Sequence, residues 1–396
     1  MLHPRTITGT GMRGINRSAI LEIIRRESPI SRTVIARRLD VSLPTVMRIV
    51  DQLVDEGLVR SKGATEWSGG RRRSLLEFNV DGHVVIGIDL GGTTMFGAIA
   101  DLGGSILDEA EIVRHGTSAE ESFQRLVDLI DTLLASPKLQ GRQIRGIGVG
   151  APGITRPDEG IVEWAHSLSW QNYPLKVGLA KRYSLPITVD NDVNLAALGE
   201  LWFGAGQNTQ NMVFITIGTG IGAGIIIDGA LYRGSHEASG EIGHFVLGRE
   251  FLGQRYAEFG ALESLASSTG IAEAARRALA DRRDPAELES LSAEEVFDAA
   301  RQGQEWARAI VDGVVDCLAI AVANMSVSFD PELIVLGGTV TRSIDLVGPI
   351  LRRIDGAIPT LPRLVVSTLG GRAVVMGAIA NVLHNTADFY MVRKLS

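Results

Sequence analysis

Apolar residues recur at helical spacing near the start of the chain. Residues 16–27 place isoleucines on one side of a predicted helix, the spacing expected when one face packs inward. A second predicted helix covers residues 32–39, with Ser31 as its N-terminal cap and with Val34 and Ile35 facing inward. A serine-proline pair separates the two segments, so the pattern predicts two short helices joined by a break.

A third predicted helix runs from Ser42 through Gly57. Ser42 can cap it, and Pro44 is tolerated because the first turn has no intrahelical N–H bond to lose. The residues on its inner side form a single apolar stripe, which predicts that this helix packs against the other two: Val46, Ile49, Val50, Leu53 and Val54.

Polar and basic residues next to this stripe point to a nucleic acid. Thr45, Met47 and Arg48 lie opposite the stripe, where a recognition helix presents its base-reading side chains. Residues 58–78 then read as two short strands around a Gly-rich loop, whose arginines can reach phosphates or a narrow minor groove. The order predicts a winged helix-turn-helix; the alternative is a three-helix dimerisation module with an incidental arginine cluster. The predicted DNA contacts are Ser42, Thr45, Met47, Arg48, Arg71, Arg72 and Arg73.

From residue 84 the pattern changes to strand, tight turn, strand. Asp89 ends an apolar strand, and a Gly-Gly pair makes the turn before two threonines. A Gly-rich hairpin lets backbone N–H groups approach phosphate oxygens, and a carboxylate at its base can hold a metal-bound water. Glycines also occur where a chain only needs to turn. The candidate phosphate-binding residues of this hairpin are Asp89, Gly91, Gly92 and Thr93.

A second hairpin of the same kind lies further along the chain, in residues 211–229. Two such hairpins predict two related lobes that face a nucleotide, which is the layout of the actin-like, ribonuclease-H-like fold. Gly337 and Gly338 follow another apolar strand, where the backbone could approach an adenine ring closely. The candidate phosphate-binding residues of the second hairpin are Thr216, Gly218, Thr219 and Gly220.

Between the hairpins, a strand ends at Asp190 and a helix begins soon after Asn191 and Asp192. A carboxylate at such a junction points into the cleft between the lobes, where it can take a proton from a substrate hydroxyl. The alternative for Asp192 is a helix N-cap.

Two carboxylates and an imidazole follow the second hairpin. Glu241 and His244 are three residues apart, and Glu263 comes later. Each can form paired hydrogen bonds with hydroxyl groups, which suits a sugar. A lone histidine is more often a structural residue with satisfied hydrogen bonds, so both interpretations of His244 stay open.

Charge divides the chain into two unlike parts. Residues 1–80 hold 14 basic and 8 acidic residues, whereas the rest holds 25 basic and 38 acidic ones, for a net charge of −7 over 396 residues. A basic head on an acidic body suggests a nucleic-acid-binding module joined to a part that does not touch nucleic acid. The alternative is a charged face that only water contacts.

Cysteine content and apolar segments exclude further classes of protein. The single cysteine, Cys317, excludes an intrachain disulfide and a Cys-rich zinc site. The longest apolar candidate, Cys317–Phe329, is too short to span a membrane, and no apolar segment follows the N-terminus. We therefore expect a cytoplasmic protein with no membrane partner.

These motifs, in this order, resemble the ROK family (repressors, open reading frames and sugar kinases). The head resembles the winged helix-turn-helix of its regulators, and the body resembles its kinase domain through DLGGT, GVGAPG, NDVNLAALGE, TIGTGIGAG, GEIGH, GALES and LGG. The resemblance covers residues 14–385. It implies an α/β protein with a winged helix-turn-helix in residues 1–80 and a two-lobed, actin-like sugar kinase fold in residues 81–396. It makes the two hairpins ATP-phosphate loops, Asp192 the catalytic base, and the sugar contacts Asn191, Asp192, Glu241, His244 and Glu263.

One feature of the family pattern is missing. Family members usually hold a structural zinc through the histidine of GEIGH and three cysteines, which the resemblance places at Gln254, Tyr256 and Ala261. None of these residues can supply a thiolate, so a Cys₃His site cannot form. We therefore expect no structural zinc and no metal-ligating residue, and His244 would be retained for sugar contact.

Two classes of function follow from the resemblance. The first is a sugar-responsive transcriptional regulator, most often a repressor of carbohydrate-use genes. Its partners would be double-stranded operator DNA, a small sugar effector and further copies of itself in a homodimer or homotetramer, and it would need no cofactor. The alternative is an ATP-dependent sugar kinase, alone or in addition, which would use Asp192 as general base with ATP and Mg²⁺. A sugar- or nucleotide-binding scaffold whose head no longer binds DNA is a third possibility.

Overall fold

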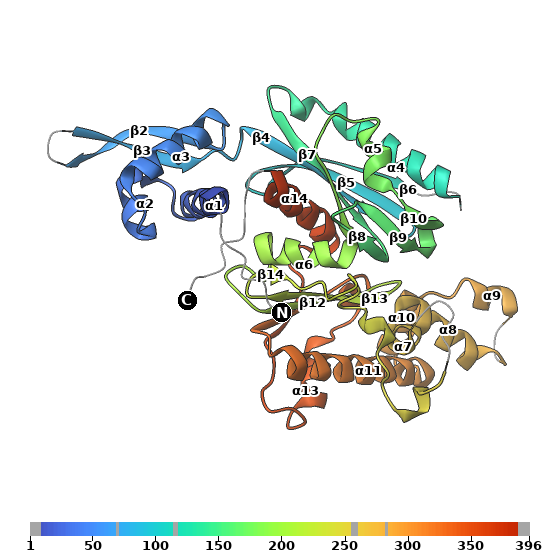
Figure 1. The fold of residues 1–396 in the computed structure, drawn as a ribbon. Helices are drawn as coiled ribbons and strands as arrows, with labels where there is room; N and C mark the ends of the chain where they lie inside the picture. The colour runs from blue at the N-terminus through green and yellow to red at the C-terminus, as the bar shows by residue number, and fades with distance from the viewer. Residues whose placement is uncertain (1–8, 69–70, 114–117, 255–259, 282–283, 387–396) are drawn as a thin grey trace, which may run out of the picture.

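The computed structural model has three parts, which Figure 1 shows as a head at the left, an upper lobe and a lower lobe. Strand β4 (His83–Leu90) runs from the head directly into the upper lobe. We call the upper lobe, residues 83–191, the N-lobe, and the lower lobe, residues 212–366, the C-lobe. The structure describes residues 9–68, 71–113, 118–254, 260–281 and 284–386.

The head contains three helices and a small sheet. Ser31 caps α2, where its hydroxyl oxygen accepts a hydrogen bond from the Val34 backbone N–H at 3.4 Å, as predicted. The strands pair in the order β1-β3-β2, and β2 and β3 form the wing. The elements are α1 (Gly9–Glu27), β1 (Ile30–Ser31), α2 (Arg32–Leu39), α3 (Leu43–Asp55), β2 (Val59–Ser68) and β3 (Arg71–Phe78).

Three side chains in the head differ from the sequence-based expectation. Val34 is 36% exposed and Val54 is 37% exposed, because each lies at the edge of its helix's apolar side rather than at its centre. Ser42 lies at the N-cap position of α3 but does not cap it. Its hydroxyl forms a hydrogen bond with Thr45 Oγ1 at 2.8 Å instead of bonding a backbone N–H of the helix.

The N-lobe is built on a sheet with strand order β11-β7-β4-β5-β6. Strands β4 and β5 form the first predicted hairpin, and β7 and β11 add in parallel beside β4. The remaining elements of this lobe are β5 (Thr94–Asp101), β6 (Ile106–Val113), α4 (Ala119–Leu134), η1 (Pro137–Leu139), β7 (Gln143–Ala151), β8 (Ile154–Arg156), β9 (Ile161–Ala165), η2 (His166–Leu168), β10 (Trp170–Tyr173), α5 (Leu175–Ala180) and β11 (Ile187–Asn191).

The C-lobe repeats this plan with strand order β14-β13-β12-β15-β16. Strands β12 and β13 form the second predicted hairpin, and β15 and β16 again add in parallel. Its elements are β12 (Met212–Ile217), β13 (Ile221–Ile227), β14 (Ala230–Leu231), η3 (Ile242–His244), η4 (Arg249–Phe251), α7 (Ala261–Ala266), α8 (Ser268–Leu279), α9 (Pro285–Glu289), α10 (Ala293–Arg301), α11 (Glu305–Phe329), β15 (Leu333–Gly337), α12 (Val340–Ser343), α13 (Val347–Ile354) and β16 (Leu364–Val366).

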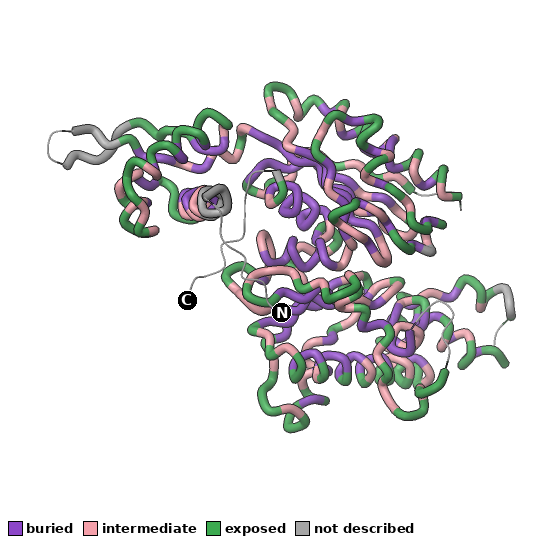
Figure 2. The backbone as a smooth tube through the Cα atoms, viewed as in Figure 1, coloured by how far each residue is buried: buried purple, intermediate pink, exposed green. Residues whose placement is uncertain are grey.

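Two helices lie between the sheets of the two lobes. Helix α14 (Ala373–Thr386) packs on the N-lobe sheet, and α6 (Asp192–Phe203) packs on the C-lobe sheet and against α14. Figure 2 shows that burial is concentrated in these helices and in the strands beside them. The helices cross closely because Gly377 has no side chain: a Cβ at this position would lie 1.6 Å from the Leu195 carbonyl oxygen.

The head and the body share one hydrophobic core. A single apolar cluster joins Ile24 of α1 and Leu53 of α3 to Val85 of β4 and Met376 of α14. Polar contacts reinforce it: the His83 Nε2 atom lies 2.8 Å from the backbone carbonyl oxygen at the end of α3. The proposed division at residue 80 therefore runs through a packed interface rather than an open linker.

Helix α11 is long and apolar enough to cross a membrane, with a mean hydropathy of 1.8. One of its sides packs into the C-lobe core through Leu318 and Val322. On another side, Asp312 and Asp316 form ion pairs with Arg353 of α13. These contacts are those of a core helix, so we interpret α11 as the central helix of the C-lobe.

Candidate functional site

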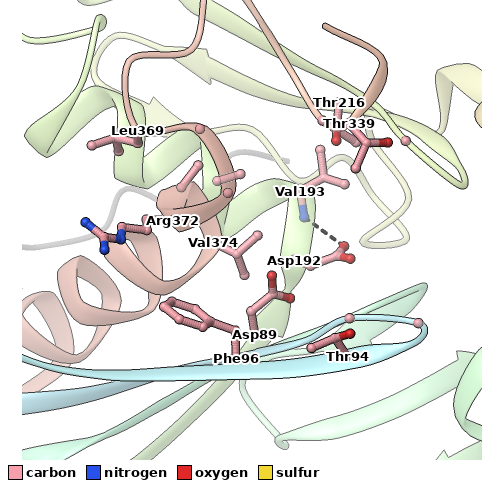
Figure 3. Close-up of a pocket in the computed structure, with 18 of the residues that line it drawn as sticks. Asp89, Thr94, Phe96, Asp192, Val193, Thr216, Thr339, Leu369, Arg372 and Val374 are labelled. Atoms are coloured by element: carbon pink, nitrogen blue, oxygen red, sulfur yellow. Dashed lines mark hydrogen bonds between the residues drawn. The ribbon is translucent and has the colours of Figure 1, made fainter. Parts of the chain in front are cut away.

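A cavity of about 900 Å³ opens between the two lobes, at the turns of the two hairpins. Gly220 is not part of its wall; a Cβ at this residue would lie 3.2 Å from Glu263 Oε2. Figure 3 shows Asp89, Asp192 and Thr216 around the same space. The predicted phosphate-binding residues that line the cavity are Asp89, Gly91, Gly92, Thr93, Thr216, Gly218 and Thr219.

Two carboxyl groups face this cavity from different elements. Burial raises the pKa of Asp89, on β4, to about 8, and the neighbouring Asp192 adds to this shift. Burial also raises the pKa of Asp192, the first residue of α6, to about 7, although the Val193 N–H donates a hydrogen bond to it at 2.8 Å. A carboxyl group with a pKa near 7 can take up a proton at neutral pH, as a general base must.

The raised pKa of Asp89 makes stability depend on pH. Between its unfolded pKa near 4 and its folded pKa near 8, the folded state binds more protons than the unfolded state, so stability falls as pH rises. An Asp89→Asn variant, which cannot ionise, is therefore expected to be more stable relative to the wild type at pH 8 than at pH 5, by about 3 to 4 kcal/mol in free energy of unfolding. Urea unfolding at both pH values measures this difference. An equal effect at both values would contradict the raised pKa.

Asn191 is the residue that caps α6, so Asp192 does not need to do so. Its side-chain oxygen accepts a hydrogen bond from the Asn194 backbone N–H at 2.9 Å. Its side-chain nitrogen donates to the Gly153 carbonyl oxygen at 2.8 Å and to Asp192 Oδ1 at 3.1 Å. The Asn191 amide is thus held in one orientation beside Asp192.

Glu241, His244 and Glu263 come from two short elements of the C-lobe, η3 with its preceding residue and α7. Glu263 Oε2 accepts a hydrogen bond from the Ile221 N–H at 2.8 Å, which ties it to the second hairpin. Burial raises the pKa of both glutamates, and the nearby His244 opposes the shift. His244 is exposed, and its ring forms no hydrogen bond within the part of the chain that the structure describes. This geometry gives no support to a structural role for that histidine.

The structure brings further residues to the cavity that the sequence did not indicate. Phe96 and Arg372 line it, and Arg372 donates a hydrogen bond to Glu109 of β6 at 2.8 Å. Arg372 lies in η5 (Gly370–Arg372), far along the chain from Glu109. No local motif marks these residues, because only the folding of η5 onto the N-lobe brings them together.

Helix α3 presents its predicted reading residues on the outside of the head. Met47 is 47% exposed, and Arg48 is exposed with no hydrogen bond or ion pair to any residue that the structure describes. Arg37 on α2, which no sequence pattern marks, is also exposed and forms no hydrogen bond or ion pair with any residue that the structure describes. Arg71–Arg73 begin strand β3 at the tip of the wing, and their side chains lie outside the described part.

The structure describes two of the three positions at which the family pattern has zinc-binding cysteines. The Gln254 side chain donates a hydrogen bond to the Glu250 carbonyl oxygen at 2.8 Å, and Ala261 is buried at the start of α7. Tyr256 lies outside the described residues. Among the residues described, no three His, Cys, Asp or Glu side chains are grouped for a metal ion. The absence of a structural zinc stays a prediction.

Comparison with models of known protein families identifies the family of this chain. Residues 85–384 match the ROK family model, and residues 15–60 match a winged helix-turn-helix DNA-binding model. The chain belongs to the ROK family. The ROK match spans both lobes, and the second match spans the helices of the head, which confirms the predicted fold class.

Individual ROK proteins match over two different spans. A xylose repressor from Caldicellulosiruptor bescii is 32% identical, over 96% of this chain and 98% of the repressor. A glucokinase from Halalkalibacterium halodurans is 35% identical, over 74% of this chain and 92% of the kinase. A crystal structure of a ROK family transcriptional regulator, a homolog of the E. coli MLC protein, is 27% identical with a TM-score of 0.83, over 96% of this chain and 97% of its own. This chain is thus built as a ROK-family transcriptional regulator.

Proposed function

We propose that this protein is a sugar-responsive repressor that binds double-stranded operator DNA through its head. The observation that carries the proposal is the match to a xylose repressor over 96% of the chain, head included. The exposed, unpaired Arg48 on α3 supports it, because a recognition helix needs free donors for base edges and phosphates. The relative's name makes D-xylose the first effector to test. The protein would act in the cytoplasm, where its DNA target lies.

The fold offers a direct route from the sugar site to the head. Helix α6 begins beside the candidate sugar contacts and ends at Trp202 and Phe203. The Arg25 guanidinium of α1 lies over the Trp202 ring, 5.6 Å from its centroid. A sugar that moved α6 would therefore also move the head. In a symmetric homodimer, this movement would change the spacing of the two recognition helices, and half-sites are read only at matching spacing.

DNA binding with and without sugar tests the proposal. We expect the protein to bind DNA from upstream of its own gene, and we expect D-xylose, D-glucose or N-acetylglucosamine to change that affinity by about tenfold. Fluorescence anisotropy at fixed salt measures the affinity, and a thermal shift identifies the sugar because a ligand of the folded state raises its stability. Failure to bind both the upstream DNA and any sequence from an unbiased site selection would overturn the proposal.

Sugar phosphorylation is a second candidate function. Asp192 and both Gly-rich hairpins face one cavity, which is the arrangement in which a base takes a hydroxyl proton during phosphoryl transfer. The cavity volume of about 900 Å³ fits a nucleotide. The hairpin turns would hold the phosphates of ATP and Asp89 a Mg²⁺-bound water, while ATP would supply the phosphoryl group. Asp192 would take the proton of the sugar hydroxyl.

A further inference from the structure

A buried ion pair connects the two lobes next to the candidate sugar site. The Arg233 guanidinium donates two hydrogen bonds to the Asp190 carboxylate, at 2.8 Å to Oδ1 and 2.5 Å to Oδ2. The Asp190 side chain is completely buried, and Arg233 also pairs with Glu237 at 3.4 Å. Such a bidentate pair fixes both distance and orientation between the elements that carry it.

The two partners belong to different lobes. Asp190 lies on β11, the edge strand of the N-lobe sheet, whereas Arg233 follows β14 at the edge of the C-lobe sheet. The carboxylate of Asp190 also accepts a hydrogen bond from the Asn191 backbone N–H at 2.8 Å. Asp190 therefore lies one residue before Asn191 and two before Asp192, where the N-lobe sheet passes into α6.

On the C-lobe side, a short segment leads from Arg233 to Glu241. The Ser239 N–H donates to the Arg233 carbonyl oxygen at 3.1 Å, which closes the segment into a loop. Gly240 then has a φ of +93°, and a Cβ there would lie 1.8 Å from the Ala223 carbonyl oxygen, so only glycine fits. Glu241 follows at once. The loop is thus held at Arg233 by the N-lobe and at Gly240 by β13.

We propose that Arg233 is a positioning residue for the sugar site, which sets the separation between the carboxylates of Asp192 and Glu241 by holding the lobes at Asp190. Neither Arg233 nor Asp190 needs to touch the sugar in this role. The proposal rests on the sugar-binding function proposed above. Buried ion pairs often add little to stability, so a role in setting the lobe separation accounts for the pair better than a role in folding alone.

An Arg233→Met variant tests the role through sugar affinity. We expect its dissociation constant for D-xylose to rise about tenfold or more, and Arg233→Lys, which keeps the charge but not the two-pronged geometry, to fall between it and the wild type. Asp190→Asn should weaken binding similarly, and the double variant should be no worse than either single one, because both remove the same link. The matched control is Arg353→Met, which removes an arginine paired with two aspartates inside the C-lobe only.

A second measurement needs no sugar. Spin labels on Arg125→Cys in α4 and Ala309→Cys in α11, in a Cys317→Ser background, report the distance between the lobes by pulsed electron resonance. Both label sites are exposed. We expect Arg233→Met to lengthen or broaden this distance distribution and Arg353→Met to leave it unchanged.

The two measurements separate the two proposals. If the wild type binds none of D-xylose, D-glucose and N-acetylglucosamine, the proposed sugar response fails, while the label distances still decide the role of Arg233. If the wild type binds a sugar but Arg233→Met binds it equally well, or if the lobe distance does not change, the positioning role is overturned. Additive effects of the Arg233 and Asp190 changes would overturn it as well.

Discussion

An Arg48→Ala variant is expected to bind operator DNA about 10- to 100-fold more weakly than the wild type. Arg48 lies in the first half of α3, is exposed, and has no partner among the described residues, so its guanidinium is free to contact a base edge or a phosphate. The change removes no core contact, because the apolar side of α3 is formed by other residues. Fluorescence anisotropy with upstream DNA at fixed salt measures the loss.

Arg125→Ala is the matched control for this experiment, since it removes an exposed arginine from α4 on the N-lobe. We expect it to bind DNA as the wild type does, and we expect both variants to unfold at the same temperature as the wild type. If Arg48→Ala kept full affinity while staying folded, α3 would not be the helix that reads DNA.

An Asp192→Asn variant is expected to lose about 10²- to 10⁴-fold in the rate of sugar phosphorylation, if the second candidate function holds, because it removes the general base. Sugar affinity should change far less, since an asparagine can still bond a hydroxyl group. A coupled ADP-release assay across hexoses, pentoses and N-acetylated amino sugars measures the rate, and calorimetry measures the affinity. A pKa of Asp192 near 7 suits the proton-accepting role proposed for it.

Asp228→Asn is the control carboxylate, because Asp228 is exposed in the β13–β14 turn with a φ of +52°, which asparagine also tolerates. A wild type that releases no ADP with any sugar would reject the kinase function and leave the repressor proposal in place. Phosphorylation by Asp192→Asn at a rate within about tenfold of the wild type would show that another group accepts the proton.

Features that depend on residues close together in the sequence were predictable from it. Periodicity together with capping residues located α2 and α3, and the two Gly-rich turns located hairpins whose sheets repeat one plan. Asn191 and Asp192 were placed at a strand-to-helix junction because polar residues follow an apolar strand there. Periodicity wrongly predicted that Val34 and Val54 are buried. Each lies on the apolar side of its helix, but the neighbouring elements cover only the middle of that side.

Features that join distant segments were not predictable in this way. Arg233 and Asp190 are separated by 43 positions and by a hairpin, and neither belongs to a motif. The contact between Arg372 and Glu109 joins residues 263 positions apart. The core shared by the head and the body was also missed, because periodicity shows that a face is apolar but not which surface covers it.

This shared core limits how the protein could be redirected to a new operator. Replacing residues 1–80 with another DNA-binding module would uncover Val85 and Met376, which the head now covers, unless the new module carried a matching apolar surface. Met47 and Arg48 lie on the side of α3 that faces away from this core. Under the proposed function, substitutions at these exposed positions would therefore change the DNA preference and leave intact the surface that connects the body to the head.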